Sequence, residues 1–141
     1  MIITNKKIKI EVTMESKKEL TLNEYQKKAM RTCLPTSENF SYMFLNLVGE
    51  VGEFASNVAK HIRKGHYSIM DSNIANGNNI DDLQDCRGAL NELKKEAGDV
   101  LWQLSGLCSV MNWSLNDIAQ QNLDKLASRQ QRIVIEGNGD N

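Results

Sequence analysis

Apolar side chains recur three and four residues apart along much of the chain, which is the spacing of one face of an α-helix. One pattern covers residues 40–64 and predicts a helix with a continuous apolar face: Phe44, Leu47, Val48, Val51, Phe54, Ala55, Val58 and Ile62. A second such pattern is convincing from Ala89 to Met111, and its start could lie as early as Asp82. Polar stripes border the two faces: Asn46, Glu50, Glu53 and Asn57 on the first, and Glu92, Glu96, Asp99 and Gln103 on the second.

Two further helices are predicted from their start signals. Thr21 and Glu24 have the spacing of a capping box, and Pro35 is expected to end the helix that follows. Ser114, with Asp117 three residues later, begins another amphipathic stretch. The four patterns predict an all-α domain over residues 21–141, built as a bundle of four to five helices.

Three segments fall outside the predicted helices. Residues 66–81 are rich in Asn, Ser and Asp, and we expect a loop insertion there. Residues 1–20 are expected to form an arm that is either mobile or pairs with a neighbouring subunit. The last residues, rich in Gly, Asn and Asp, are expected to be irregular.

Composition narrows the class of protein. The 141 residues contain one proline and few aromatic side chains, which favours helices. A net charge of −1, from 17 basic and 18 acidic residues, gives no footprint for nucleic acid, and no apolar run is long enough to span a membrane. Three cysteines without a C-x-x-C pair indicate reduced thiols and a cytoplasmic protein. Both histidines, His61 and His66, are expected at the surface.

Two acidic pairs have the same spacing, one on each long helix. Glu50 and Glu53 stand three residues apart, as do Glu96 and Asp99, which puts both members of a pair on one side of a helix. One such pair alone usually marks a solvated face. If the two helices pack antiparallel, however, four carboxylates face one another, and a divalent cation would relieve their repulsion. Mg²⁺ suits such a site because it prefers oxygen ligands.

These motifs resemble a known family. The segments LVGEVGEFASNVAKHIRKG (47–65) and LKKEAGDVLWQLSGL (93–107) are similar to the two acidic motifs of MazG-type nucleotide pyrophosphohydrolases, in the all-α NTP pyrophosphatase superfamily. LNEYQKKAMRT (22–32) and NLDKLASRQQRIVIEGNGDN (122–141) resemble the opening helix and the tail of one branch, so the resemblance covers residues 20–141. One departure is Gly49, where many relatives have a further glutamate. A second departure is the stretch between the two motifs, residues 54–95, which is longer than usual in the family. Its 66–91 region could be a lid, a subunit contact or neither.

The resemblance implies hydrolysis of a nucleoside triphosphate, NTP or dNTP, to the monophosphate and pyrophosphate, in house-cleaning of the nucleotide pool. It further implies that the four carboxylates hold Mg²⁺, or alternatively Mn²⁺, and that one of them, such as Glu53, accepts a proton from the attacking water. It implies substrate-phosphate contacts from three residues near the end of the chain, with two lysines as weaker candidates: Asn122, Lys125, Arg129, Lys60 and Lys64.

Several alternatives stay open at this point. The substrate could be another nucleotide such as phosphoribosyl-ATP, or the domain could be a catalytically silent interaction module. Asn122 is as well suited to bond a neighbouring helix, and Lys125 and Arg129 could be solvated charges. Trp102 either stacks on a base or packs at a subunit interface. Because apolar surface lies on more than one side of the helices, we expect a homodimer or homotetramer.

Overall fold

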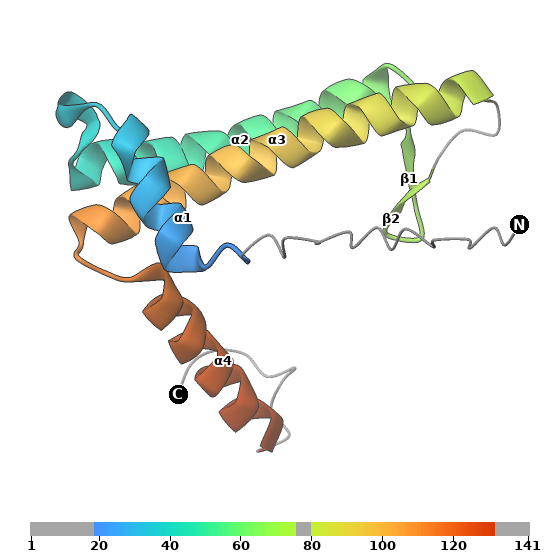
Figure 1. The fold of residues 1–141 in the computed structure, drawn as a ribbon. Coiled ribbons are helices and arrows are strands. Elements are labelled where there is room, and N and C mark those ends of the chain that lie inside the picture. Colours follow the sequence, from blue (N-terminus) through green and yellow to red (C-terminus); the bar gives the residue numbers. More distant parts are fainter. Residues whose placement is uncertain (1–18, 76–79, 132–141) are drawn as a thin grey trace, which may run out of the picture.

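A computed structural model describes residues 19–75 and 80–131, and these are mostly helical, as the sequence predicted. Two long helices, α2 (Phe40–Arg63) and α3 (Ile80–Val110), lie antiparallel and in contact along their length (Figure 1). They form the body of the fold. The predicted arm, apart from its last two residues, and the predicted irregular tail lie outside the described residues.

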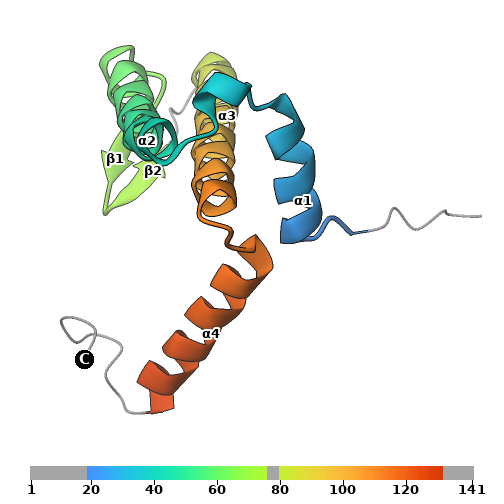
Figure 2. The same ribbon diagram turned by 90° about the vertical axis from the view of Figure 1, so that its left-hand side faces the viewer.

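The first helix, α1 (Leu22–Ala29), begins as its sequence indicates. The Thr21 side chain accepts a hydrogen bond from the Glu24 N–H, and the Glu24 carboxylate accepts one from the Thr21 N–H, each at 3.1 Å. Single 3₁₀ turns at Met30–Thr32 and Pro35–Ser37 then connect α1 to α2. Viewed from the side, α1 lies beside α3 (Figure 2).

The last helix, α4 (Leu115–Gln131), extends away from the other helices (Figures 1 and 2). Its direction is set by α1, whose side chains bind its first backbone amides. Gln26 Oε1 accepts a hydrogen bond from the Leu115 N–H at 3.0 Å, and Asn23 Oδ1 accepts one from the Asn116 N–H at 3.1 Å. Amides in the first turn of a helix have no partner within the helix, so α1 supplies one.

The predicted loop over 66–81 contains regular structure that the sequence did not indicate: a β-hairpin and, at residues 80–81, the start of α3. Strands β1 (Ser68–Met70) and β2 (Asn73–Ala75) pair antiparallel, with Ile69 opposite Ile74. Asp71 and Ser72 make the two-residue turn at positive φ, 49° and 64°. Asp tolerates this left-handed backbone well, and a tight turn of this kind matches the twist of the strands.

The buried residues lie in small groups along α2 and α3. Tyr67, Cys86 and Ala89 form one cluster with Val58, where the hairpin leaves α2. At the opposite end of the helix pair Met43 is fully buried, and its side chain occupies the space that a Cβ at residue 106 would need. Glycine at 106 therefore allows Met43 to reach α3. Across the described residues, no helix is both long and apolar enough to cross a membrane.

The continuous apolar face predicted for residues 40–64 is split in the structure. Leu47, Phe54 and Val58 are half-buried, whereas a stripe further round the helix is exposed: Phe40, Phe44, Val48, Val51 and Ile62, here called the α2 stripe. The side chains of α2 that are buried in its middle and last turns are polar, Asn57 and His61. The expected surface position of His61 is therefore wrong. Within one chain, α3 covers only one side of α2, and that side includes the polar stripe.

Candidate functional site

Polar side chains line the contact between α2 and α3. The Asn57 amide donates a hydrogen bond to Glu96 Oε1 at 3.4 Å. Gln103 of α3 lies near Glu50 of α2, where hydrogen bonding from its amide lowers the pKa of that carboxyl. One turn beyond Asn57, the ring of His61 contacts Glu92 Oε2 through Nε2 at 3.0 Å. Periodicity placed Asn57 and Gln103 in polar stripes but assigned them no role. Their only sequence signal is that each stands seven residues after a glutamate.

Three of the four predicted metal ligands come together in the middle of this contact. Glu50 of α2 and Glu96 and Asp99 of α3 each offer a carboxylate oxygen, and these three oxygens lie within 4.8 Å of one another. We call these residues the acidic group. Glu50 and Glu96 are half-buried and Asp99 is exposed, so the group opens to solvent on one side. Glu53, one turn from Glu50, is exposed and lies outside the group.

The carboxyl of Glu50 is a weaker acid than usual, because it is partly buried and lies among other negative charges. Partial burial raises the pKa of this carboxyl, and the negative charges of Glu53, Asp99 and Glu96 raise it further, against an opposing hydrogen bond from Gln103. Tyr25 reaches the same region from α1: burial raises the pKa of its hydroxyl and the Asp99 charge adds to this. A site that holds several carboxylates against their repulsion has the chemistry of a divalent-cation site.

The two predicted lysines of α2 differ in their surroundings. Lys60 Nζ lies 2.8 Å from Glu92 Oε2, which also contacts His61. The hydrogen bonds from Lys60 and His61 lower the pKa of Glu92 to about 2. This carboxylate is therefore held by cationic and imidazole groups of the protein. Lys64 directly follows the end of α2, and it is exposed.

Trp102 packs within its own chain. Its indole N–H contacts the Ala29 carbonyl oxygen at 3.2 Å and Thr32 Oγ1 at 2.9 Å, so the ring fixes the end of α1 to α3. Sequence reasoning offered a base or a subunit interface for this ring and missed α1, because the two segments are far apart in the chain.

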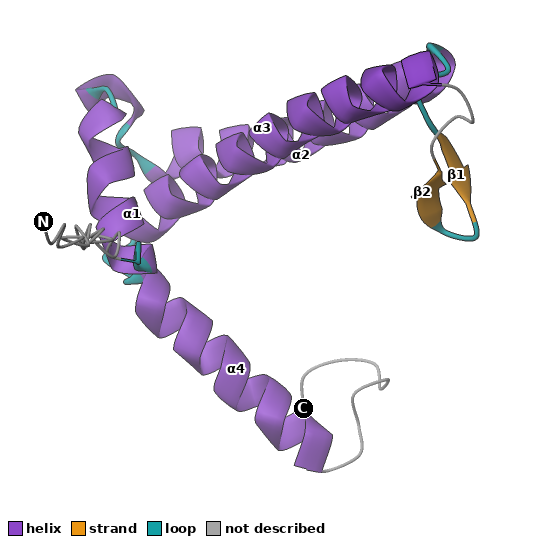
Figure 3. Ribbon diagram, turned by 45° about the vertical axis from the view of Figure 1, so that its right-hand side comes forward, coloured by secondary structure: helices purple, strands orange, loops and turns teal. Residues whose placement is uncertain are grey.

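The three predicted phosphate contacts lie on α4, which diverges from the α2–α3 pair (Figure 3). Asn122 and Lys125 are exposed and Arg129 is half-buried. Within one chain, the structure does not bring this helix to the acidic group. The side chains do share one helix, at positions three and four residues apart.

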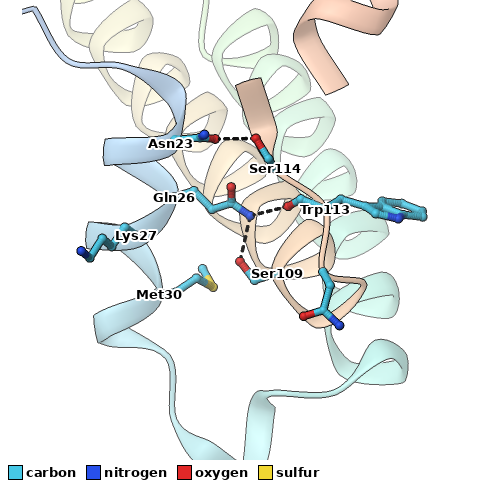
Figure 4. A pocket seen from close by; sticks show the side chains of 8 residues that line it. Asn23, Gln26, Lys27, Met30, Ser109, Trp113 and Ser114 are labelled. Atoms are coloured by element: carbon cyan, nitrogen blue, oxygen red, sulfur yellow. Dashed lines mark hydrogen bonds between the residues drawn. The ribbon is translucent and has the colours of Figure 1, made fainter. Parts of the chain in front are cut away.

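An open groove of about 420 Å³ lies where α1, the end of α3 and the start of α4 meet (Figure 4). Four of its polar side chains join these helices by hydrogen bonds: Asn23, Gln26, Ser109 and Ser114. Gln26 Nε2 donates to Ser109 Oγ at 3.0 Å and to the Trp113 carbonyl oxygen at 2.9 Å, and Ser114 Oγ donates to Asn23 Oδ1 at 2.9 Å. The groove is thus the joint that holds α4, and the acidic group lies elsewhere on α2 and α3.

Comparison with known proteins identifies the family that the sequence matches. A family model described as the MazG nucleotide pyrophosphohydrolase domain matches residues 38–134, which include both acidic motifs. A protein described as "Gene 37 protein", from Mycobacterium phage L5, is 38% identical over 104 residues, 74% of this chain and 77% of the phage protein. No solved structure matches the chain.

Proposed function

The chain belongs to the MazG nucleotide pyrophosphohydrolase family, and we propose that it hydrolyses a nucleoside triphosphate, NTP or dNTP, to the monophosphate and pyrophosphate. The observation that carries this proposal is the acidic group, in which three carboxylate oxygens from two helices lie within 4.8 Å. The substrate and the metal dependence are our inference from this geometry and from the chemistry of the family.

Glu50, Glu96 and Asp99 are the residues that would hold Mg²⁺, or Mn²⁺ in its place. Their oxygens are the hard ligands that this ion prefers, and the exposed side at Asp99 leaves room for a triphosphate. A bound Mg²⁺ supplies positive charge that neutralises the triphosphate and the departing pyrophosphate. Glu53, exposed one turn away, is our candidate to accept the proton of the attacking water.

We also propose that the protein works as a homodimer or a homotetramer. The α2 stripe presents large apolar side chains to solvent, among them Val48 with 59% and Val51 with 53% of its surface exposed. Phe40 and Phe44 stack against each other at its start, with ring centroids 5.7 Å apart. A second copy is the occupant that fits, since the same stripe on both copies can pair about a two-fold axis. In such an assembly, Asn122, Lys125 and Arg129 of α4 could meet the phosphates bound at a partner's acidic group.

The test has two parts, binding and turnover. Calorimetry with Mg²⁺ or Mn²⁺, with and without a non-hydrolysable nucleotide, separates an enzyme from a silent interaction module: we expect metal-dependent nucleotide binding. A panel of common NTPs, dNTPs and phosphoribosyl-ATP is then assayed for pyrophosphate against orthophosphate. Glu53→Gln should abolish pyrophosphate release while metal binding persists, and Lys125→Ala should raise KM. Absence of metal-dependent binding would overturn the proposal.

A further inference from the structure

Three polar contacts cross from α2 to α3 in one register. Moving seven residues forward along α2, from Glu50 to Asn57, is matched by moving seven residues back along α3, from Gln103 to Glu96. The arrangement is therefore reciprocal, because each helix gives one glutamate and one amide. The Asn57 amide bonds Glu96, and the Gln103 amide lies beside Glu50 and lowers the pKa of its carboxyl. Asp99, the third member of the acidic group, lies on α3 between Glu96 and Gln103.

The two amides are unusual in how they are buried. Asn57 is 8% exposed and Gln103 is 4% exposed, yet Asn57 Oδ1 and Gln103 Oε1 are buried without a hydrogen-bond partner. Burying a carbonyl oxygen without a partner costs stability. An apolar side chain of the same shape would avoid this cost, so the fold alone does not account for an amide at either position.

The third contact in this register is built differently. Four residues beyond Asn57 and four before Glu96, His61 meets Glu92, and Lys60 binds the same carboxylate oxygen at 2.8 Å. Glu92 is thus paired with an ammonium group of the protein, which offsets its negative charge. Glu50 and Glu96 are held by neutral N–H donors instead, which orient a carboxylate and leave its charge in place.

We propose that Asn57 and Gln103 are positioning residues that hold Glu96 and Glu50 with an oxygen facing the ion, an inference that rests on the proposed metal-dependent function. A donor on one oxygen restricts rotation of the glutamate before the ion arrives, so less conformational entropy is lost on binding. Glu50 and Glu96, which lie beside amides in this register, are therefore the proposed ligands, whereas Glu92 is paired with Lys60.

The test uses substitutions of similar shape in the full chain, Asn57→Leu and Gln103→Met, with Mn²⁺ binding measured by calorimetry and Tm measured in chelator. We expect Mn²⁺ to bind about 10-fold or more weakly to each variant, while Tm stays equal or rises because the unpartnered carbonyl is gone. Asn46→Leu is the matched control. Asn46 lies on α2 and bonds the Tyr42 carbonyl oxygen of its own helix, so its replacement should leave Mn²⁺ affinity unchanged.

A second substitution tests why the donor is neutral. Gln103→Lys places an ammonium group beside Glu50, as Lys60 stands beside Glu92, and we expect a folded protein with weaker Mn²⁺ binding than Gln103→Met. Unchanged Mn²⁺ affinity in Asn57→Leu and Gln103→Met would overturn this inference and leave the proposed function standing. A lower Tm together with weaker binding would also overturn it, since the amides would then support the fold. Wild-type protein that binds no Mn²⁺ would instead overturn the proposed function.

Discussion

Glu50→Gln should stabilise the metal-free protein, because it removes one negative charge from the acidic group. Two carboxylate charges at the 4.8 Å limit of the acidic group repel by about 0.9 kcal/mol in bulk water and by about 3.5 kcal/mol at an effective dielectric constant of 20. Glu50 has two such neighbours, Glu96 and Asp99, and the group opens to solvent, so the lower figure applies. We expect a gain of about 1–2 kcal/mol in the free energy of unfolding, or roughly 3–8 °C in Tm.

The assay is thermal unfolding by circular dichroism in chelator at low salt. Gln103 can still donate to the new amide carbonyl, so the change isolates the charge. The control is Asp85→Asn, which removes an exposed acid of α3 outside the acidic group and should leave Tm nearly unchanged. High salt should shrink the gain, and Mg²⁺ should raise the Tm of the wild type more than that of the variant. A Tm equal to or below that of the wild type in chelator would refute the reasoning.

Two further predictions concern the ion pair at Glu92 and the α2 stripe. Lys60→Met should make the free energy of unfolding less sensitive to acid. Lys60 helps to hold the pKa of Glu92 at about 2, below its ordinary value of 4.5. The ionised Glu92 therefore stabilises the wild type above pH 4.5, and this stabilisation is lost as the pH falls towards about 2. Urea unfolding between pH 5 and 3 measures this, and parallel curves for variant and wild type would contradict it. Val48→Glu should convert the assembly to monomers, because it places a charge in the apolar α2 stripe. Light scattering after gel filtration measures the mass, and a monomeric wild type would contradict the proposed oligomer.

Features that depend on neighbouring residues could be predicted from the sequence. The capping box at Thr21 and the two long helices follow from spacings within a few residues, and the structure confirms them. The two acidic motifs were likewise visible as pairs. Because each pair lies on one helix face, antiparallel packing was sufficient to expect that carboxylates from both helices would approach.

Features that depend on distant residues could not be predicted. The direction of α4 is set by Asn23 and Gln26, which bind its first amides from about ninety residues earlier in the chain. The β-hairpin has strands of three residues, too short for a period to be recognised. Periodicity also marked one apolar face on α2 without indicating that α3 covers only part of it. That division depends on how many helices pack around α2, which no local pattern records.

The central claim is that the acidic group supports cleavage between the α- and β-phosphates of a nucleoside triphosphate. Phosphorus NMR of each nucleotide incubated with the protein and Mg²⁺ tests it most directly, with Glu96→Gln and Asp99→Asn as comparisons whose folding is checked by circular dichroism. We predict that the triphosphate signals are replaced by those of a monophosphate and pyrophosphate, and that both variants leave the triphosphate intact. Diphosphate with orthophosphate as products, or full turnover by either variant, would contradict the claim.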